Sequence, residues 1–272
     1  MRSFLVKAAL KTVSIIAGNK WSQSLLEKTV AAAQYAQGIG SGESVASSGE
    51  MAVISKLAAT VHADGRSLCI FDVGANTGQF LRSACAALRA VRFQLHSFEP
   101  GFEAYRQLSQ TAGKYPNVIL NNFGLGHEPS ERALHYDAPG SALASLSKRR
   151  LTHFKTEMSL SEKVKIETLD DYCGAHEIGH IDLLKIDVEG HELEVLNGAN
   201  RMFCSSSIGL VVFEFGGCNI DTRTFVQDFF YFFSGHNMRM ARITPSGYFH
   251  ELLSYREILE QFRTTNFLCY RV

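Results

Sequence analysis

The sequence predicts an α/β fold, a mostly parallel sheet of about seven strands with helices on both faces. From residue 67 onward, short apolar runs alternate with segments of helical periodicity, which is the pattern of strand–helix–strand crossovers. A glycine-containing turn, GANTG, follows the first of these runs directly. Acidic residues recur at the ends of later runs. In a parallel sheet those ends form one edge, where ligands bind.

The expected elements follow one another in a regular order. Strands are expected over 67–73, 91–100 and 117–124, with helices over 77–90 and 102–114 between them. Two antiparallel strands, 132–139 and 163–169, enclose a polar segment, 140–161. Strands 181–188 and 208–215 then resume the parallel series, followed by helices 192–200 and 224–235. Strands 238–245 and 266–272 complete the sheet, and a terminal hairpin makes the last one antiparallel.

The chain divides into an extension and one main domain. Residues 1–50 are expected to form a helical N-terminal extension, which ends in a Gly/Ser-rich linker over 38–50. Residues 51–272 form the α/β domain, and its first helix is expected near Met51–His62.

The first 20 residues contain four cations and no acid: Arg2, Lys7, Lys11 and Lys20. Lys7 and Lys11 interrupt the apolar core that a secretory signal requires. A helix lying on a membrane surface is one alternative. The preferred interpretation is a helix whose apolar face packs on the domain or on a second subunit of a homo-oligomer.

Composition narrows the class of protein. The 27 basic and 27 acidic residues give a formal net charge of zero, which does not indicate a nucleic-acid partner. No apolar run approaches the ~18 residues that cross a bilayer. Six widely spaced cysteines without a CxxC pair are typical of reduced thiols. These features predict a cytoplasmic protein.

The turn after the first strand reads D-x-G-x-N-x-G, with Asp72, Gly74, Asn76 and Gly78. It is not a Walker A loop, because Gln79 stands where the motif requires its second glycine, and it does not match GxGxxG. The glycines allow the backbone to approach a ligand, and asparagine tolerates the left-handed conformation. These four residues are therefore assigned to a cofactor site, with Asp72 expected to accept from an ammonium group or a bridging water.

Glu99 ends the second strand in the motif SFEP. An acid at this position can accept from both ribose hydroxyls of a nucleoside cofactor. A nicotinamide cofactor would use it equally well, so Glu99 indicates a nucleoside without naming it. Asn122 is included among the expected cofactor-binding residues.

The stretch LLKIDVEGHELEVLNGA, residues 183–199, places Asp187 and Glu189 at the same edge of the sheet. Together with FDVGANTG, SFEP, ETLDDY and VVFEF, it resembles the FkbM family of S-adenosylmethionine-dependent methyltransferases. The resemblance runs in order from about Leu68 to Phe215.

This resemblance implies a class I (Rossmann-like) methyltransferase fold with S-adenosylmethionine as the cofactor. It further implies O-methylation of a hydroxyl on a saccharide, glycolipid or polyketide-type natural product, so that the partner is a small-molecule or glycan acceptor. Two alternatives stay open: an NAD(P)-dependent oxidoreductase, and a catalytically inactive module that binds S-adenosylmethionine.

Four residues are candidates for catalysis: Asp187, Glu189, His191 and Glu214. His191 is the candidate base, because the ordinary pKa of histidine lies nearest working pH. Asp187 and Glu214 could orient the acceptor or hold a divalent cation such as Mg²⁺. Asp187 is also expected to contact the cofactor. No metal is assigned.

The segment 141–155 is expected to form the wall of the acceptor site. Ser141 and Ser145 could bind the cofactor or a sugar. A basic run within the segment suggests either a phosphate-bearing acceptor or, preferably, a solvated loop: Lys148, Arg149, Arg150 and Lys155.

HEIGH, residues 176–180, matches the HExxH zinc-protease motif. That chemistry requires both histidines on one face of a helix. Gly179 weakens a helix here, and a strand begins directly after His180. A loop between helix and strand is therefore preferred.

Overall fold

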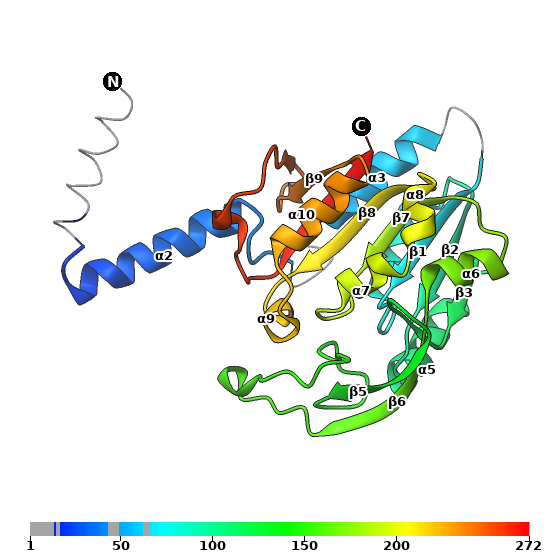
Figure 1. Cartoon of the computed structure of the whole chain (residues 1–272), viewed down its shortest axis with the longest axis horizontal. Helices are drawn as coiled ribbons and strands as arrows, with labels where there is room; N and C mark the ends of the chain where they lie inside the picture. The colour runs from blue at the N-terminus through cyan, green and yellow to red at the C-terminus, as the bar shows by residue number, and fades with distance from the viewer. Residues whose placement is uncertain (1–13, 15–16, 43–48, 62–65, 272) are drawn as a thin grey trace.

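The computed structural model describes residues 14, 17–42, 49–61 and 66–271 (Figure 1). Its main sheet has the strand order β10-β9-β11-β8-β7-β1-β2-β3. Five strands are parallel: β1 (Leu68–Val73), β2 (Phe93–Phe98), β3 (Val118–Asn121), β7 (Ile181–Ile186) and β8 (Ile208–Phe215). The other three are β9 (Met238–Ile243), β10 (Phe249–Glu251) and β11 (Thr265–Arg271).

The strand order confirms the predicted fold class. β11 lies between β8 and β9 and is antiparallel to both, as the terminal hairpin required. The short edge strand β10 adds an eighth strand to the seven expected. The order of the parallel strands reverses at the neighbours β1 and β7, so a crevice is expected at their carboxyl ends.

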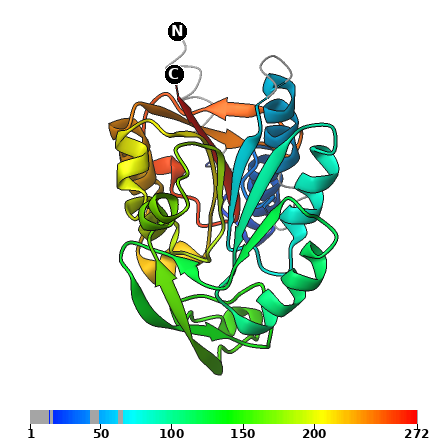
Figure 2. The same ribbon diagram turned by 90° about the vertical axis from the view of Figure 1, so that its right-hand side faces the viewer.

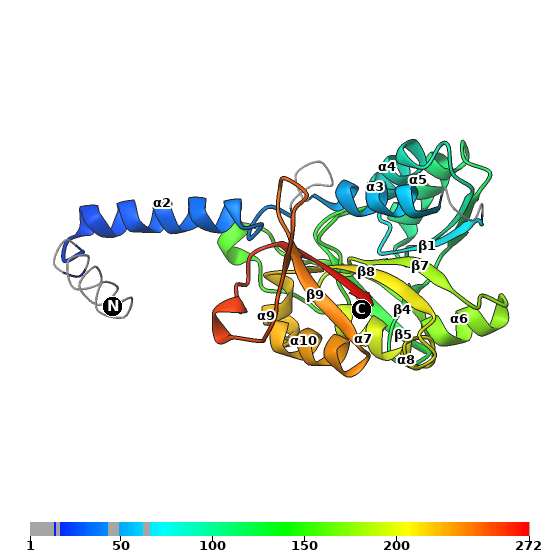
Figure 3. The same ribbon diagram turned by 90° about the horizontal axis from the view of Figure 1, so that it is seen from above.

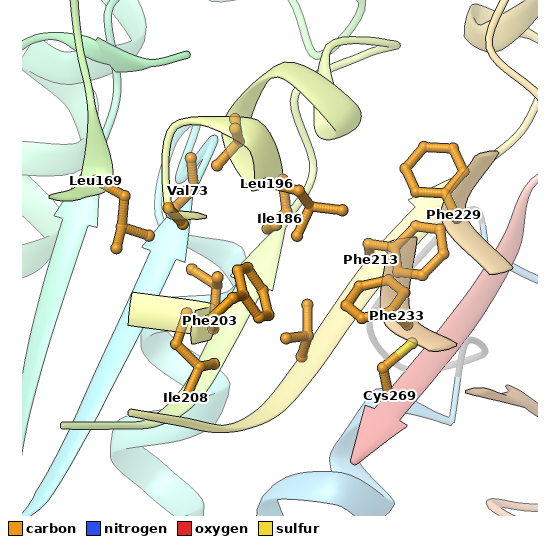
Figure 4. Packing of buried hydrophobic residues seen from close by; sticks show 14 of the residues in the cluster. Val73, Leu169, Ile186, Leu196, Phe203, Ile208, Phe213, Phe229, Phe233 and Cys269 are labelled. Atoms are coloured by element: carbon orange, nitrogen blue, oxygen red, sulfur yellow. The ribbon is translucent and has the colours of Figure 1, made fainter. Parts of the chain in front are cut away.

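Helices cover both faces of the sheet (Figure 2). On one face lie α3 (Glu50–Val61), α4 (Gln79–Ala87) and α5 (Phe102–Ala112). On the other lie α6 (Leu169–Ala175), α7 (Glu192–Asn197), α8 (Asn200–Cys204) and α10 (Val226–Gly235). Figure 4 shows the core of this second face, where Phe213 of β8 stacks on Phe229 of α10 with ring centroids 4.6 Å apart. The buried phenylalanines of α10, Phe229 and Phe233, are thus core residues.

A second, three-stranded sheet joins the carboxyl edge of the main one. It consists of β4 (Gly124–Leu125), β5 (Ser130–Tyr136) and β6 (Leu160–Glu167), in the order β4-β6-β5. β5 and β6 are antiparallel, as predicted. The expected strand 117–124 divides, because β3 ends at Asn121 and β4 pairs with β6 instead. The connection from β5 to β6 contains the short 3₁₀ helix η1 (Thr152–Phe154).

The helix α2 (Lys20–Ala36) projects away from the body (Figures 1 and 3). None of its residues is buried, so α2 does not pack along the domain. The helix expected within residues 1–20 lies almost wholly outside the described residues. No described helix is long and apolar enough to cross a membrane.

The Gly/Ser-rich stretch 38–50 was predicted to be a linker, but residues 38–42 within it are fixed to the body. Gly38 and Ile39 are buried, and the amides of Gly40 and Gly42 both donate to the Thr264 carbonyl. A Cβ atom on Gly38 would lie 2.1 Å from the Ile243 carbonyl oxygen. Glycine is needed here for close approach of two backbones rather than for flexibility. Residues 43–48 lie outside the described part of the chain.

Candidate active site

A cavity of about 390 Å³ lies at the carboxyl ends of β1, β2, β7 and β8. Its volume is in the range of small-molecule sites. Gly74, Glu99 and Asp187 line it at three of these strand ends. The segment 141–146 and the start of α3 close it from other directions. The topology therefore brings most of the predicted cofactor and catalytic residues to one place, whereas Asp72, Gly78 and Asn122 do not line the cavity.

The turn after β1 depends on glycine at Gly74. Its φ is +81°, and a Cβ atom would lie 1.8 Å from the Asp187 carbonyl oxygen. No other residue fits, because the turns that follow β1 and β7 lie against each other here. Asn76 is left-handed too, with φ +45°, and its side chain donates to the Ser141 carbonyl. The turn is thereby linked to the expected acceptor wall.

Glu99 is buried at the cavity and organises the same turn. One carboxylate oxygen accepts from the Asn76 amide at 2.9 Å and the other from the Gly101 amide at 2.8 Å. Each oxygen has a second lone pair for a ligand hydroxyl. Burial raises the pKa of Glu99 to about 7, although these two hydrogen bonds act in the opposite direction.

Asp72 lies beneath the cavity instead of lining it. Its side chain is fully buried, and the ammonium of Lys185 lies 3.4 Å away. Lys185 also lies 3.2 Å from Asp187. Burial raises the pKa of Asp72, and Lys185 opposes that shift. The ammonium that Asp72 faces thus belongs to the protein.

Asp187, Glu189 and Glu214 each offer a carboxylate oxygen within 4.8 Å of the others. Glu189 forms an ion pair with the buried guanidinium of Arg149. Burial and then the neighbouring Asp187 raise the pKa of Glu189 to about 8 and that of Glu214 well above its ordinary value. Three oxygens in this arrangement could share protons, face a positively charged ligand or hold a divalent cation.

His191 lines the cavity, and only 4% of its surface is exposed. Its Nδ1 lies 3.1 Å from Glu194 and its Nε2 lies 3.0 Å from the hydroxyl of Ser147. Arg132 pairs with Glu194 at 2.9 Å. The hydrogen bond from His191 lowers the pKa of Glu194, which keeps that carboxylate ionised. An ionised partner at Nδ1 favours the tautomer whose Nε2 accepts a proton.

The segment 141–155 lines the cavity through its first half. Ser141 and Ser145 are lining residues, and the Ser145 hydroxyl donates to the Glu189 carbonyl at 2.8 Å. The basic run does not act as a unit. Arg149 is buried and paired, whereas the other three cations are exposed: Lys148, Arg150 and Lys155.

Asn122 is exposed and lies outside the cavity lining. Its amide donates to the Glu99 and Pro100 carbonyls. In this position it supports the chain that carries Glu99 and does not face the cavity.

The HEIGH motif forms no helix. His176 ends α6 and its ring lies 4.3 Å from that of Tyr172. His180 precedes β7, and its Nε2 is 3.4 Å from Asp182. Glu177 between them has φ +54°. The two histidines therefore do not share a helix face, as expected for a loop.

Several cavity and supporting residues were not identified from the sequence: Glu50, Gln79, Ser147, Lys185 and Glu194. Of these residues, only Lys185 could have been identified from the sequence. It is a lysine within a continuous apolar strand, and such a residue is rarely buried without a partner. The others are ordinary polar residues that the fold brings to the cavity from distant segments.

A Rossmann-like sheet with an antiparallel β11 beside β8, and a cavity at the carboxyl ends of its parallel strands, defines a class I methyltransferase fold. The model of the methyltransferase FkbM domain family matches residues 72–254, more than half of the chain. The chain belongs to this family. This sets aside the oxidoreductase alternative.

Two relatives illustrate the breadth of the similarity. The hexuronic acid methyltransferase AglP of Haloferax volcanii is 25% identical over 146 residues, which cover 53% of this chain and 54% of that protein. The crystal structure of an FkbM methyltransferase from Methylobacillus flagellatus is 16% identical with a TM-score of 0.48, covering 80% of this chain and 48% of that one. The chain thus spans about half the length of each.

A third similar structure is the precorrin-6y C5,15-methyltransferase of Geobacter metallireducens. It is 12% identical, with a TM-score of 0.42 over 82% of this chain and 87% of that one.

Proposed function

We propose that the chain is an S-adenosylmethionine-dependent O-methyltransferase acting on a hydroxyl of a saccharide, glycolipid or polyketide-type natural product. The observation that carries this proposal is the arrangement of His191. Its ring is held by an ionised carboxylate at Nδ1, and its Nε2 is hydrogen-bonded to a hydroxyl, that of Ser147. It lines the same cavity as the glycine turn and Glu99.

The described residues fit the cofactor that the family implies. The backbone at Gly74–Asn76 and the carboxylate of Glu99 would hold its nucleoside portion, because no side chain fits between the turns and each Glu99 oxygen retains an acceptor position. When bound, S-adenosylmethionine supplies a methyl group on a positively charged sulfonium. Asp187, Glu189 and Glu214 are the carboxyl groups at the cavity that would face this charge.

Methyl transfer to an alcohol requires alignment and the removal of a proton. Alignment lowers much of the barrier for a displacement of this kind. His191 would accept the hydroxyl proton at Nε2, in place of its contact with Ser147, while Glu194 stabilises the resulting imidazolium. The segment 141–146 would shield the reactants from water.

The charge of the cavity favours a hydroxyl over a carboxylate as the methyl acceptor. Five of the described lining residues are acids: Glu50, Glu99, Asp187, Glu189 and Glu214. Lys185 is the one lysine or arginine among them, and it is paired with Asp72 and Asp187. The carboxylate of an acceptor would be repelled by these acids. The name of the Haloferax relative supports a sugar acceptor, and a hexuronic acid offers both hydroxyl and carboxyl groups.

Transfer of isotopically labelled methyl from S-adenosylmethionine to a panel of neutral hexoses, uronic acids and their glycolipids tests this proposal. We expect base-stable methyl ethers on at least one saccharide. Base-labile methyl esters would contradict hydroxyl transfer, and no product on any acceptor, with the cofactor bound, would favour the inactive module.

A chelator added to the same assay separates two modes of activation. Activity that persists with chelator and is lost in His191→Ala supports the histidine base. Activity that chelator abolishes, with Asp187→Ala the more damaging variant, assigns the activation to a metal.

A further inference from the structure

We propose that α2 is a docking surface for an anionic lipid bilayer. The proposal goes beyond methyl transfer, and its test does not depend on it. Four large apolar side chains of α2 face solvent: Trp21 is 81% exposed, Leu25 56%, Val30 54% and Tyr35 47%. The described part of the body covers none of them.

Three of these four side chains lie on one side of α2, and Val30 lies on the other. At 3.6 residues per turn, Trp21, Leu25, Ala32 and Tyr35 fall within an arc of about 80°. Gln23, Glu27 and Gln34 fall on the opposite side by the same spacing, together with Val30, and Lys20 lies between the two sides. α2 thus presents a narrow apolar arc to solvent.

The polar side is the one that contacts the body. Gln34 donates to Gln261 at 2.7 Å and accepts from Arg263 at 2.8 Å. The next residue beyond the helix, Gln37, accepts from Arg242 at 2.7 Å through its carbonyl. These contacts fix the C-terminal end of α2, which projects from the body (Figure 3). By helical spacing, the apolar arc lies away from Gln34. The arc is therefore free to meet an external partner.

Charge indicates which partner this is. Residues 1–36 contain five basic residues and one acid, Glu27, whereas the whole chain has zero net charge. The extension is therefore positive and the remainder of the chain negative. Lysine and arginine near an anionic bilayer contribute roughly 1 kcal/mol each, which screening by salt reduces.

Lys28 distinguishes a bilayer from a second copy of the chain. It lies within the apolar arc, between Leu25 and Ala32 by helical spacing. In a pair of such helices this lysine would occupy the seam, which destabilises the pair. On a bilayer its stem lies along apolar surface while the ammonium reaches the phosphates. Tryptophan at such an interface is also favoured.

The extension joins the body at the edge of the cavity, because Gly42 is a lining residue and residues 38–42 are fixed to the body. Binding of α2 to a bilayer would thus place the cavity of the same chain close to the lipid surface.

The test uses the full chain and the fluorescence of Trp21, its only tryptophan. We expect a shift of emission to shorter wavelength, and co-sedimentation, with vesicles of phosphatidylcholine containing phosphatidylglycerol. Both signals should weaken with added salt and with vesicles of phosphatidylcholine alone. Leu25→Ser/Tyr35→Ser should bind at least about tenfold more weakly. Val30→Ser, an equally exposed site on the opposite side, should bind like the wild type.

Three results would overturn the proposal. One is the absence of an emission shift and of sedimentation with the anionic vesicles. Another is unchanged binding by Leu25→Ser/Tyr35→Ser. The third is a lipid-independent emission shift that rises with protein concentration together with a dimer mass, which would show that a second copy covers the apolar arc.

Discussion

The buried carboxylates of Glu99 and Asp72 differ in the groups that they face. Glu99 is directed at the cavity and receives two backbone amides, whereas Asp72 is directed at Lys185 below it. Both are buried, and burial raises the pKa of both. Their neighbours therefore decide their use: Glu99 retains acceptor positions for a ligand, and Asp72 stabilises the lysine that also contacts Asp187.

Glu99→Ala should weaken the binding of S-adenosylmethionine by ~1.5–3 kcal/mol, the range for the loss of a hydrogen bond to a charged group. Titration calorimetry measures the dissociation constant directly. Glu128→Ala, an exposed acid on a surface loop, is the matched control and should leave it unchanged. Equal affinities for the wild type and Glu99→Ala would show that Glu99 does not contact the cofactor.

His191→Ala should lower turnover by ~10²–10⁴-fold with little change in cofactor affinity, because it removes the proton acceptor. Glu194→Gln should reduce turnover less and should move the pH profile of kcat, since Glu194 acts by orienting the ring. His250→Ala, an exposed histidine on β10, provides the control. A turnover that survives His191→Ala would transfer the role of base to a carboxylate.

Sequence reasoning at this scale identified the residues that chain order places at strand ends, such as Glu99, Asp187 and Glu214. It could not find Ser147 and Glu194 as partners of His191, because the first of these contacts joins segments 44 residues apart. Sequence reasoning also grouped Arg149 with its exposed neighbours Lys148 and Arg150. Buried and exposed positions in a loop do not recur at a fixed spacing, so the sequence pattern could not separate them.

Two turns form the floor of the cavity, one after β1 and one after β7. Gly74 in the first lies against the Asp187 carbonyl in the second. The second turn is held by the buried carboxylate of Glu192, which accepts from the amides of Val188 and Gly190. Periodicity predicted the strands on both sides because it reflects burial. It also predicted a linker over residues 38–50, but residues 38–42 pack against the body. The sequence does not separate the two cases, because close backbone packing and flexibility both select glycine.

Gly74→Ala should destabilise the fold and abolish cofactor binding, because the Cβ atom forces the two turns apart and the φ of +81° is strained. Thermal unfolding and calorimetry measure the two effects. Gly174→Ala is the control, since no atom lies within 4 Å of a Cβ atom there. It should be neutral or slightly stabilising. If Gly74→Ala binds the cofactor like the wild type, the turn is not the binding element.

The whole molecule concentrates acids in one cavity, and this affects stability. The folded-state pKa values of Glu99 and Glu189, about 7 and about 8, exceed the ordinary value of 4.5. Between the ordinary pKa and these raised values, the folded chain therefore binds more protons than the unfolded chain. The free energy of unfolding of the ligand-free protein should therefore fall as pH rises from about 5 to about 8.

Glu214→Gln should raise the thermal stability of the ligand-free protein at about pH 8, on the order of 1–3 kcal/mol, and change it less at about pH 5.5. The reason is that it removes a buried negative charge beside Asp187 and Glu189. Glu128→Gln should show no such pH dependence. Lower stability of Glu214→Gln at both pH values would mean that the carboxylate forms favourable contacts instead.

The central claim is that the cavity at the carboxyl ends of β1 and β2 binds S-adenosylmethionine for methyl transfer. Titration calorimetry of the wild-type chain and Gly74→Ala, each with S-adenosylmethionine and with NAD, tests it most directly. The predicted result is saturable one-site binding of S-adenosylmethionine to the wild type, none to Gly74→Ala, and no heat of binding with NAD. Binding of NAD without binding of S-adenosylmethionine, or equal binding to both chains, would contradict it.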